Sequence, residues 1–282
     1  MPLRLVIPKG RIYDRVAEIL AECGLRLSGV ERSYRPVASM PEIEVKLLKS
    51  QNIPPLLALG QHDVGFAGHD WILEQNAEVE TLLDLGFDPV RIVAAVPEET
   101  DLDELKKRRI IAVSEYQNLT TQFLQREGYN FTFVRSYGAT EVFPPEDADL
   151  IVDNTASGAT LTANRLKVIG TVLESTTRFI ANPQALRDPA KKAVIDNLLL
   201  LMGGVLQGRS RVLLEMNCAP ERLDAVVAML PAMRSPTVAQ LFNANGFSIK
   251  AAVPVKDVPL LVPQLIAAGA SDILEMPIRK VI

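Results

Sequence analysis

One stretch of the sequence has the residue types of an anion-binding loop. Residues 149–166 begin with the apolar run 150–152, which predicts a strand, and end in a segment that favours a helix. Backbone N–H groups at such a strand–loop–helix junction point toward a bound anion. Gly158 lets the backbone approach a ligand closely, and Asp153, at the strand end, can accept hydrogen bonds from sugar hydroxyls. The loop itself is small and polar: Thr155, Ala156, Ser157, Gly158, Ala159 and Thr160.

The same loop lacks the residues of a nucleotide P-loop. That motif needs a Lys followed by Ser or Thr for the outer phosphates and Mg²⁺, and no Lys lies between Val152 and Arg165. The residues therefore predict a monophosphate cradle beside a hydroxyl-binding acid, which is a site for a sugar 5-phosphate. The alternative is an ordinary strand–turn–helix corner that uses Ser and Gly for turn chemistry.

A second candidate anion site lies near the start of the chain. Residues 3–7 predict a strand, and the apolar positions between 16 and 23 keep a helical rhythm that ends at Gly24. Lys9, Gly10 and Arg11 therefore lie at a strand-to-helix turn, where a cation beside free N–H groups attracts an anion. A solvated basic turn is an equally good interpretation of these three residues.

Other polar side chains at predicted strand ends have less local support. His69 and Asp70 follow a short buried strand at 63–68, but no Ser or Cys nucleophile motif accompanies them, so a polar strand end is the favoured interpretation. Glu141 precedes a Phe-Pro-Pro segment. It either caps a helical turn or faces the ligand, and the sequence does not decide between these roles.

Composition limits the kinds of partner. The chain has 282 residues, 48% hydrophobic and 23% charged, with a formal net charge of −4, so its surface as a whole does not attract nucleic acid or acidic membranes. Cys23 and Cys218 have no metal or redox spacing. The longest apolar stretch, 198–206, is too short to span a bilayer. We expect a soluble, cytoplasmic protein that binds neither nucleic acid nor membranes.

Strands and helices alternate along most of the chain, which favours an α/β fold with ligands at the strand ends. Residues up to about 86 and from about 91 to 174 read as two α/β units. Two crossing strands, near 87–96 and 171–182, would join them and leave a cleft between two lobes. The last part follows the order βαββαβ of a ferredoxin-like unit. Such a unit serves either as a small-molecule sensor or as an oligomerisation module.

Taken together, these segments make the chain resemble the ATP phosphoribosyltransferase family over nearly its whole length. The resemblance is carried by residues 7–11, 63–70, 138–141 and 149–166, and it extends to Met216-Asn217 and Ser235-Pro236-Thr237. It implies an α/β fold with a two-lobed, periplasmic-binding-protein-like catalytic part and a C-terminal ferredoxin-like regulatory domain. The implied divisions are 1–89 with 176–206 for catalytic lobe I, 90–175 for lobe II with the phosphoribosyl-binding loop, and 207–282 for the regulatory domain.

The resemblance also implies an activity. Members transfer the phosphoribosyl group of phosphoribosyl pyrophosphate to N1 of the adenine of ATP, giving phosphoribosyl-ATP and pyrophosphate, the first step of histidine biosynthesis. The loop 155–160 would bind the 5-phosphate and Asp153 the ribose hydroxyls. ATP or pyrophosphate would meet Lys9, Gly10, Arg11, Asp70 and Glu141. Mg²⁺ would arrive with the pyrophosphate, because the protein alone builds no metal site. A non-catalytic two-lobed binding or regulatory protein is the alternative.

The C-terminal segment makes the chain similar to the long form of the family, which needs no separate regulatory subunit. That form is a homo-oligomer, in which dimers assemble to a hexamer, and histidine inhibits it. By resemblance, the effector site would involve Asn217, Ser235, Pro236 and Thr237. The chain differs from many members in having Lys49 where they have Arg, which loses a bidentate fork. It also has Asn217 where some histidine-sensing members have Asp.

Overall fold

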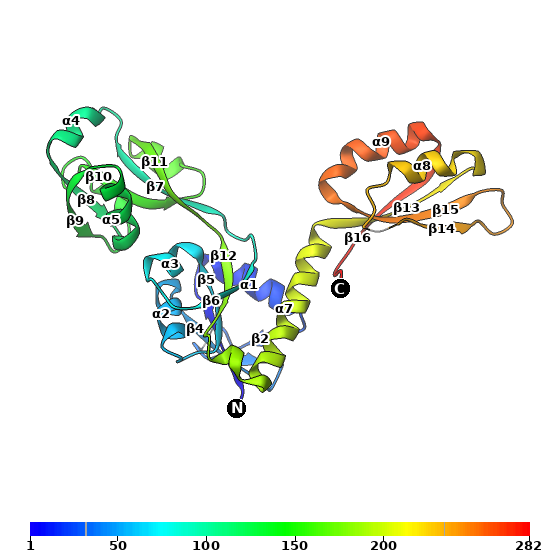
Figure 1. Cartoon of the computed structure of the whole chain (residues 1–282), viewed down its shortest axis with the longest axis horizontal. Coiled ribbons are helices and arrows are strands. Elements are labelled where there is room, and N and C mark those ends of the chain that lie inside the picture. The colour runs from blue at the N-terminus through cyan, green and yellow to red at the C-terminus, as the bar shows by residue number, and fades with distance from the viewer. Residues whose placement is uncertain (32, 234) are drawn as a thin grey trace. The chain divides into compact units, whose positions relative to one another are not determined.

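The computed structural model describes residues 1–31, 33–233 and 235–282 as a mixed α/β protein (Figure 1). The chain separates into two compact units, Met1–Asp196 and Asn197–Ile282. The first unit contains two five-stranded sheets and the second contains one four-stranded sheet. A two-stranded pair, β2 (Leu27–Ser28) with β3 (Val37–Ala38), completes the sheets found among the described residues.

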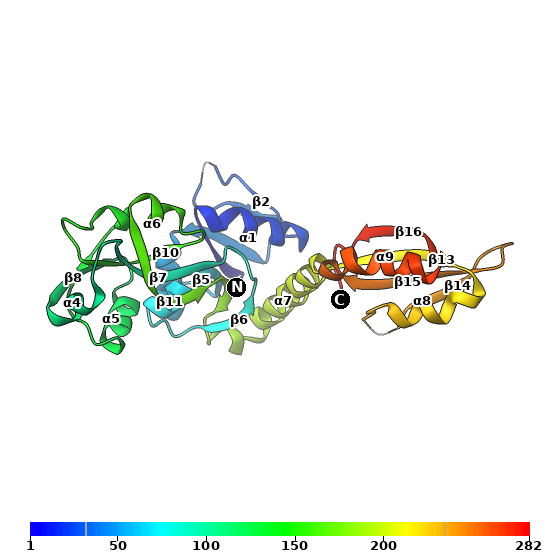
Figure 2. The same ribbon diagram turned by 90° about the horizontal axis from the view of Figure 1, so that it is seen from above.

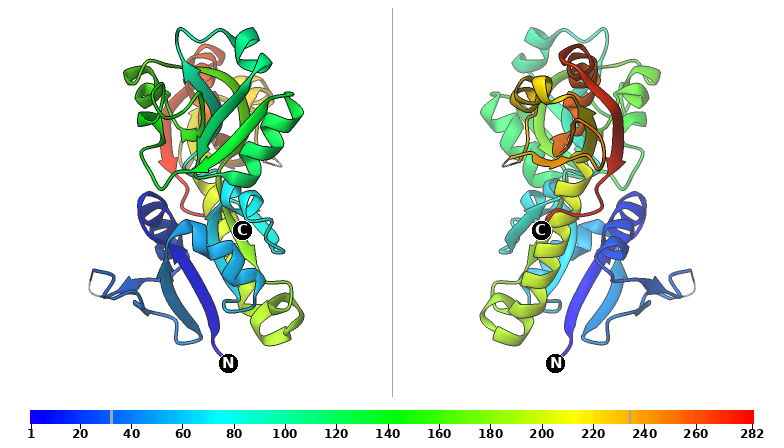
Figure 3. Two further views of the ribbon diagram at one scale, coloured as in Figure 1. Left: turned by 90° about the vertical axis from the view of Figure 1, so that its left-hand side faces the viewer. Right: turned by 90° about the vertical axis from the view of Figure 1, so that its right-hand side faces the viewer.

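The first sheet has the strand order β4-β1-β5-β12-β6. Strands β1 (Leu3–Pro8), β4 (Ile43–Leu48) and β5 (Val64–Gly68) are parallel, and β1 and β4 lie side by side in Figure 3. Five of the six β1 residues are buried, as expected for a strand covered on both faces. Antiparallel pairing of β12 (Thr177–Ala181) with β5 and with β6 (Glu80–Asp84) completes the sheet. Its helices are α1 (Arg11–Glu22), α2 (Ile53–Ala58) and α3 (His69–Glu74).

The second sheet has the order β11-β7-β10-β8-β9. Strands β8 (Arg109–Ser114), β9 (Asn130–Arg135) and β10 (Leu150–Thr155) are parallel. Both β10 and β11 (Leu166–Ser175) pair antiparallel with β7 (Val90–Pro97). The helices are α4 (Leu102–Lys107), α5 (Gln117–Arg126) and α6 (Ala159–Ala163). The predicted helix after the loop is shorter than expected: α6 has five residues, and β11 begins at Leu166.

Two neighbouring segments connect the sheets. Ser175 at the end of β11 pairs with Val90 at the start of β7. Beyond that pair, the Thr177 N–H donates to the Phe87 carbonyl, and the Leu85 N–H donates to the Thr177 carbonyl. The connections are therefore hydrogen-bonded to each other where they pass from one sheet to the other, and they run side by side in Figure 1. The predicted pair of crossing strands is present.

The C-terminal unit contains one antiparallel sheet with the order β14-β15-β13-β16. Its elements follow one another as β13 (Arg211–Cys218), α8 (Leu223–Met229), β14 (Thr237–Gln240), β15 (Phe247–Pro254), α9 (Val258–Ala268) and β16 (Ala270–Pro277). Both helices lie on one face of the sheet (Figures 1 and 2), where Met216, Ile249 and Leu265 are fully buried. Strands β14 and β15 are consecutive in the chain and pair antiparallel as a hairpin.

The division between the two units falls, along the chain, within helix α7 (Pro189–Arg209). Asp188 accepts hydrogen bonds from the Ala190 and Lys191 N–H groups, so it caps the helix, and Pro189 occupies the first helical position. Short 3₁₀ helices occur at Ser50–Asn52, Thr140–Val142, Ala185–Arg187, Pro220–Arg222 and Val255–Asp257. Among the helices described here, none combines the length and apolar character needed to cross a membrane.

Candidate active site

A polar pocket of about 380 Å³ lies where β10 ends. It brings together four segments that are distant in sequence: the start of α1, the end of β8, the turn before β10, and the loop after β10. Of the predicted site residues, it is lined by Arg11, Glu141, Asp153, Thr155, Ala156, Ser157 and Thr160. The sequence interpretation missed Glu115, Gly138, Ala139, Thr140, Asn154 and Leu161. The signal for Glu115 was its position directly after a buried strand.

The loop after β10 is held by its own side chains. Gly158 has φ +82°, a conformation that L side chains rarely adopt, and a Cβ at this position would meet no atom within 4 Å. The glycine is therefore required by the backbone angle and not by crowding from protein. Its N–H donates to Thr155 Oγ1 at 2.9 Å, and the Ala159 N–H donates to Ser157 Oγ at 3.3 Å. These bonds hold the loop in its shape.

Asp153 is the most perturbed acid of the pocket. Burial raises its pKa to about 6, with smaller increases from the charges of Glu141 and Glu115. Hydrogen bonds from the Asn154 N–H, 2.7 Å from Oδ1, and from the Thr140 hydroxyl act in the opposite direction. A carboxylate with a raised pKa in a pocket is a frequent feature of functional sites. At neutral pH Asp153 is mostly ionised and favours a cationic or hydroxyl-bearing ligand.

The pocket carries more negative than positive side chains. Its described lining has three carboxylates, from Glu115, Glu141 and Asp153, and one guanidinium, from Arg11. A polyphosphate placed here alone would be repelled. A divalent cation bound to the polyphosphate reverses that interaction. Within the described residues, no group of three or more His, Cys, Asp or Glu side chains is arranged to hold a metal ion without help.

Asp70 does not line this pocket. It is 5% exposed, and it accepts hydrogen bonds from the Tyr116 hydroxyl at 2.9 Å and from Ser175 Oγ at 2.6 Å. Asn154, which does line the pocket, donates through Nδ2 to the Tyr116 hydroxyl at 3.3 Å. Burial, followed by the charge of Asp70, raises the pKa of Tyr116, so the phenol stays protonated and acts as the donor. Asp70 thus reaches the pocket only through other side chains.

Helix α3 contacts the second sheet although it follows a strand of the first. The Trp71 ring stacks on Tyr116 at 4.7 Å between centroids and belongs to the core beneath the second sheet. Glu74 is 3% exposed, and its carboxylate accepts from the Asn118 and Leu119 N–H groups, each at 3.1 Å. These are free N–H groups of the first turn of α5, so Glu74 caps that helix. The two sheets are therefore linked by buried polar contacts as well as by strands.

Lys9 and Gly10 lie at the predicted strand-to-helix turn, with β1 ending at Pro8 and α1 beginning at Arg11. Gly10 has φ +94°, which explains a glycine here. Both residues are exposed, and Lys9 Nζ lies 4.0 Å from the centroid of the Tyr34 ring, a cation–π distance. Of the three predicted residues of this turn, the structure brings Arg11 alone to the pocket.

The predicted effector residues lie in strands β13 and β14 of the C-terminal unit and in the segment directly before β14. Asn217 of β13 is opposite Ser248, and Thr237 of β14 is opposite Lys250. Strand alternation puts both on the sheet face opposite the helices. Asn217 Nδ2 donates to Asp272 Oδ2 at 3.1 Å, so a carboxylate that the sequence interpretation missed lies beside it. Ser235 is exposed and Pro236 is half-buried, both outside the strands.

Two α/β sheets joined by paired strands, with a carboxylate-lined pocket at the end of β10, define a mixed α/β protein with a polar pocket at a strand end. Two family models match the chain. One, described as HisG: ATP phosphoribosyltransferase, covers residues 49–204, and the other, described as HisG, C-terminal domain, covers residues 208–280. The chain belongs to the ATP phosphoribosyltransferase family, and the resemblance drawn from the sequence is confirmed.

Full-length relatives agree with this assignment. A protein from Pelotomaculum thermopropionicum named ATP phosphoribosyltransferase is 40% identical over all of both chains. Another, from Desulforudis audaxviator, is 39% identical over all of both chains. A third, from Chlorobium phaeobacteroides, is 38% identical and covers 99% of this chain and 97% of its own. Each carries the same name.

A solved structure aligns with part of the chain. A chain from the ATP phosphoribosyl transferase (HisG:HisZ) complex of Thermotoga maritima aligns with a TM-score of 0.64 and 25% identity. The alignment covers 98% of that chain but 71% of this one. The present chain is therefore longer, and its match to the C-terminal family model over residues 208–280 makes it a long-form member.

Proposed function

We propose that the chain transfers the phosphoribosyl group of phosphoribosyl pyrophosphate to N1 of the adenine of ATP, releasing pyrophosphate, as the first step of histidine biosynthesis. The observation that carries this proposal is the pocket at the end of β10, which joins an acid of raised pKa to a loop of small and hydroxyl residues in a chain of this family.

In this proposal the loop holds the sugar 5-phosphate. Thr155, Ser157 and Thr160 supply hydroxyls to the lining, and Ala156 supplies backbone without a bulky side chain. Gly158 and Ala159 contribute through the loop conformation, because their N–H groups are bonded to Thr155 and Ser157. A bound phosphate would compete with these two bonds, so binding would rearrange the hydroxyls.

Asp153 is proposed to contact the ribose. Its carboxylate would accept hydrogen bonds from the ring hydroxyls and stabilise positive charge at C1 as the bond to pyrophosphate breaks. Adenine N1 has a lone pair and needs no general base to attack C1. The work of the protein is then to hold two polyanions in line and to stabilise charge in the transition state. The pKa of about 6 leaves Asp153 ionised for this role at neutral pH.

Arg11 and Glu141 are proposed to face ATP or the departing pyrophosphate, since both line the pocket. Lys9 and Gly10 directly precede Arg11 in the same turn, and we propose that they contact the same ligand from outside the pocket lining. Asp70 would act indirectly, by holding Tyr116 and through it Asn154. Mg²⁺ is proposed to enter with the pyrophosphate group, since three carboxylates and one guanidinium fit a polyphosphate that carries a divalent cation.

We also propose a division of the chain into lobes and a regulatory domain, which is supported by the sheet topology. The paired connections between sheets support two periplasmic-binding-protein-like lobes, 1–89 with 176–206 and 90–175. The order β14-β15-β13-β16 with both helices on one face supports a ferredoxin-like regulatory domain at 207–282.

Histidine would bind that domain near Asn217, Ser235, Pro236 and Thr237 and inhibit the enzyme. We propose a homo-oligomer, with dimers forming a hexamer in the cytoplasm, and no separate regulatory subunit.

The test is direct. The purified chain is incubated with ATP, phosphoribosyl pyrophosphate and Mg²⁺, and phosphoribosyl-ATP is followed by absorbance and mass spectrometry. Product formation that depends on both substrates is expected. No product at any protein concentration that permits oligomers would contradict the enzyme assignment and favour the binding-protein alternative. Adding histidine to the same assay tests the regulatory domain separately, since an unchanged rate at saturating histidine would contradict inhibition alone.

A further inference from the structure

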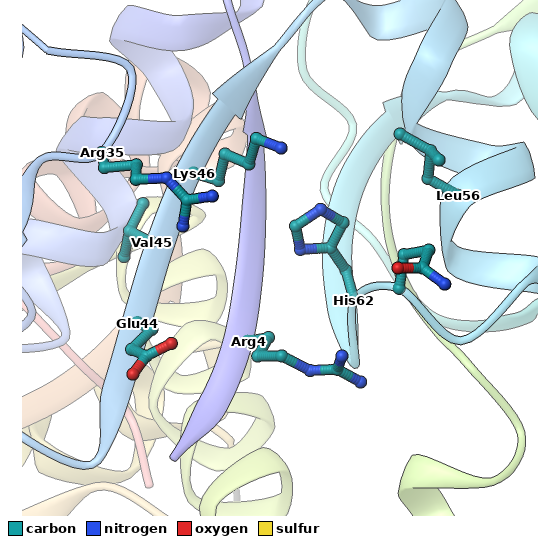
Figure 4. Close-up of a pocket in the computed structure, with 8 residues that line it drawn as sticks. Arg4, Arg35, Glu44, Val45, Lys46, Leu56 and His62 are labelled. Carbon is teal, nitrogen blue, oxygen red and sulfur yellow. The ribbon is translucent and has the colours of Figure 1, made fainter.

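A second pocket, of about 320 Å³, lies on the first sheet away from the pocket of the β10 loop (Figure 4). Its lining includes Arg4 of β1, Glu44 and Lys46 of β4, and His62, which precedes β5. Arg4 is the second residue of β1, whereas Arg11 lies beyond its last. At about 3.3 Å per residue, the two positions are roughly 20 Å apart along the chain. The pockets share no lining residue.

This pocket has an excess of positive charge. Its lining contains three cationic side chains, Arg4, Arg35 and Lys46, and one carboxylate, Glu44, which leaves two positive charges in excess. Arg4 is bound through Nε and Nη2 to Asp63, which also accepts from Lys191 Nζ at 2.9 Å. Asp63 therefore already has two cationic partners and does not neutralise the remaining charges of the pocket.

Arg35 and Lys46 are the two cations left for a ligand. In the part of the chain that the structure describes, neither forms an ion pair with an acidic side chain. The loop that carries Arg35 is fixed against the sheet, because the Leu47 N–H donates to the Tyr34 carbonyl at 2.8 Å. Figure 4 shows the Lys46 ammonium directed across β1 toward the His62 ring, with Arg35 beside Val45. Both side chains therefore line the same pocket.

His62 supplies an independent sign of a missing partner. The residue is 9% exposed, and its Nδ1 atom is buried without a hydrogen-bond partner. A buried polar atom without a partner is unfavourable and uncommon. The ring lies between Arg4, Lys46 and Leu56 in the close-up. An anionic oxygen between His62 and Lys46 would give this nitrogen an acceptor when it carries a proton, and would give the ammonium a counter-charge.

We propose that this pocket binds the dianionic phosphate group of a small molecule, held by Lys46, Arg35 and His62. A phosphate or phosphomonoester carries close to two negative charges at neutral pH, so it can pair with both Arg35 and Lys46, whereas a simple carboxylate carries one. Leu56 and Val45 add an apolar side that suits an organic group attached to the phosphate. This site is separate from the proposed substrate site and stands whether or not the proposed reaction occurs.

The two histidines of the chain make the test specific. The full-length protein is labelled with ¹³C,¹⁵N-histidine, and the imidazole resonances of His62 and His69 are followed by NMR. Inorganic phosphate is added at constant ionic strength, and phenyl phosphate is added in a parallel titration. We expect the His62 resonances to shift along a saturating curve while those of His69 do not follow it. Tighter binding of phenyl phosphate would identify a phosphomonoester as the ligand, and equal or weaker binding would identify free phosphate.

Variants separate a built site from general screening of charge. Lys46→Gln and Arg35→Gln should each weaken the His62 response roughly tenfold or more, because each removes a charge-assisted hydrogen bond. Lys192→Gln is the matched control, since Lys192 is exposed on α7 and paired with Asp196. No His62 shift at tens of millimolar phosphate would overturn the proposal. So would equal responses in Lys46→Gln and the control, or tighter binding of citrate than of phosphate.

Discussion

The two pockets of the first unit have similar size and opposite charge. The pocket at the β10 loop, about 380 Å³, has three carboxylates and one guanidinium, and the pocket at His62, about 320 Å³, has three cations and one carboxylate. A search for phosphate sites by charge alone would choose the second. Under the proposed function, the acidic pocket binds a polyphosphate that arrives with a divalent cation, and its carboxylates then face the metal charge. The basic pocket suits a phosphate that carries no metal.

The largest expected effect comes from removing Mg²⁺. With EDTA in excess over the metal, turnover should fall below detection, because the phosphoribosyl pyrophosphate would meet three carboxylates without a counter-cation. The phosphate response of His62 should remain unchanged under the same conditions. Enzyme assays measure the turnover and NMR titrations measure the His62 response, with one preparation of the protein used for both experiments. Loss of the His62 response with EDTA would contradict the distinction between the pockets.

Asp153→Asn should lower kcat by roughly 10² to 10³, the size found for removing one preorganised electrostatic group from an active site. The amide keeps the shape of the side chain but cannot stabilise positive charge at C1. Steady-state kinetics with both substrates would measure the change. Glu146→Gln is the control, because Glu146 is an exposed acid outside the pocket lining. A variant with wild-type kcat would show that Asp153 binds ribose without a role in the chemical step.

The raised pKa of Asp153 also predicts a pH dependence of stability. Between about pH 4 and pH 6 the folded protein holds a proton on Asp153 that the unfolded chain has released. The unfolding free energy attributable to this group should therefore fall as pH rises through that window. The difference between 3.8 and about 6 corresponds to at most about 3 kcal/mol.

Urea unfolding of the wild type and of Asp153→Asn at pH 4.5, 5.5 and 7 measures the predicted dependence of the unfolding free energy on pH. The variant should gain stability relative to the wild type as pH rises, because it lacks the buried charge. Parallel curves at all three pH values would contradict the assigned cause. Turnover of the wild type should fall below about pH 6, as Asp153 becomes protonated.

Tyr116→Phe should lower the unfolding free energy by about 1.5–3 kcal/mol, since it removes a donor from the buried carboxylate of Asp70. Tyr137→Phe is the control, because that side chain is 90% exposed and should have almost no effect. Turnover should fall along with stability in Tyr116→Phe, since Asn154 loses one of its two side-chain partners beside the acidic pocket and keeps only Asp153. The His62 response should not change, because the basic pocket has no contact with this network.

The smallest expected effect is on one substrate. Thr160→Val should weaken binding of phosphoribosyl pyrophosphate about tenfold, through loss of one hydrogen bond to a charged phosphate, and leave ATP binding unchanged. Thr162→Val is the matched control on the same helix, since the Thr162 hydroxyl donates to the Gly158 carbonyl and does not line the pocket. Titration calorimetry with phosphoribosyl pyrophosphate and with ATP measures the two dissociation constants separately for each variant. Equal losses for both substrates would contradict the loop assignment.

The residues alone determined the local features of this protein. The alternation of apolar runs with Gly and Pro predicted the main strands and helices, because burial and turn chemistry act within a few residues. Gly10 and Gly158, both with positive φ, stand where a strand turns into a helix. The small polar loop next to Asp153 identified the candidate pocket, and the family resemblance was correct over the full length.

Tertiary structure decided where the polar groups of distant segments meet. The family resemblance placed Asp70 among the ATP or pyrophosphate contacts, and the folded chain buries its carboxylate against Tyr116 and Ser175, which are 46 and 105 positions away. The basic pocket joins Arg4, Arg35, Lys46 and His62, which belong to no motif. Neighbouring residues settle backbone angles and local turns, but the environment of a side chain depends on which strands pair. Strand pairing is set by burial over the whole sheet. The net charge of each pocket, the pKa of Asp153 and the access of a ligand to each pocket therefore depend on the tertiary structure and cannot be derived from local sequence.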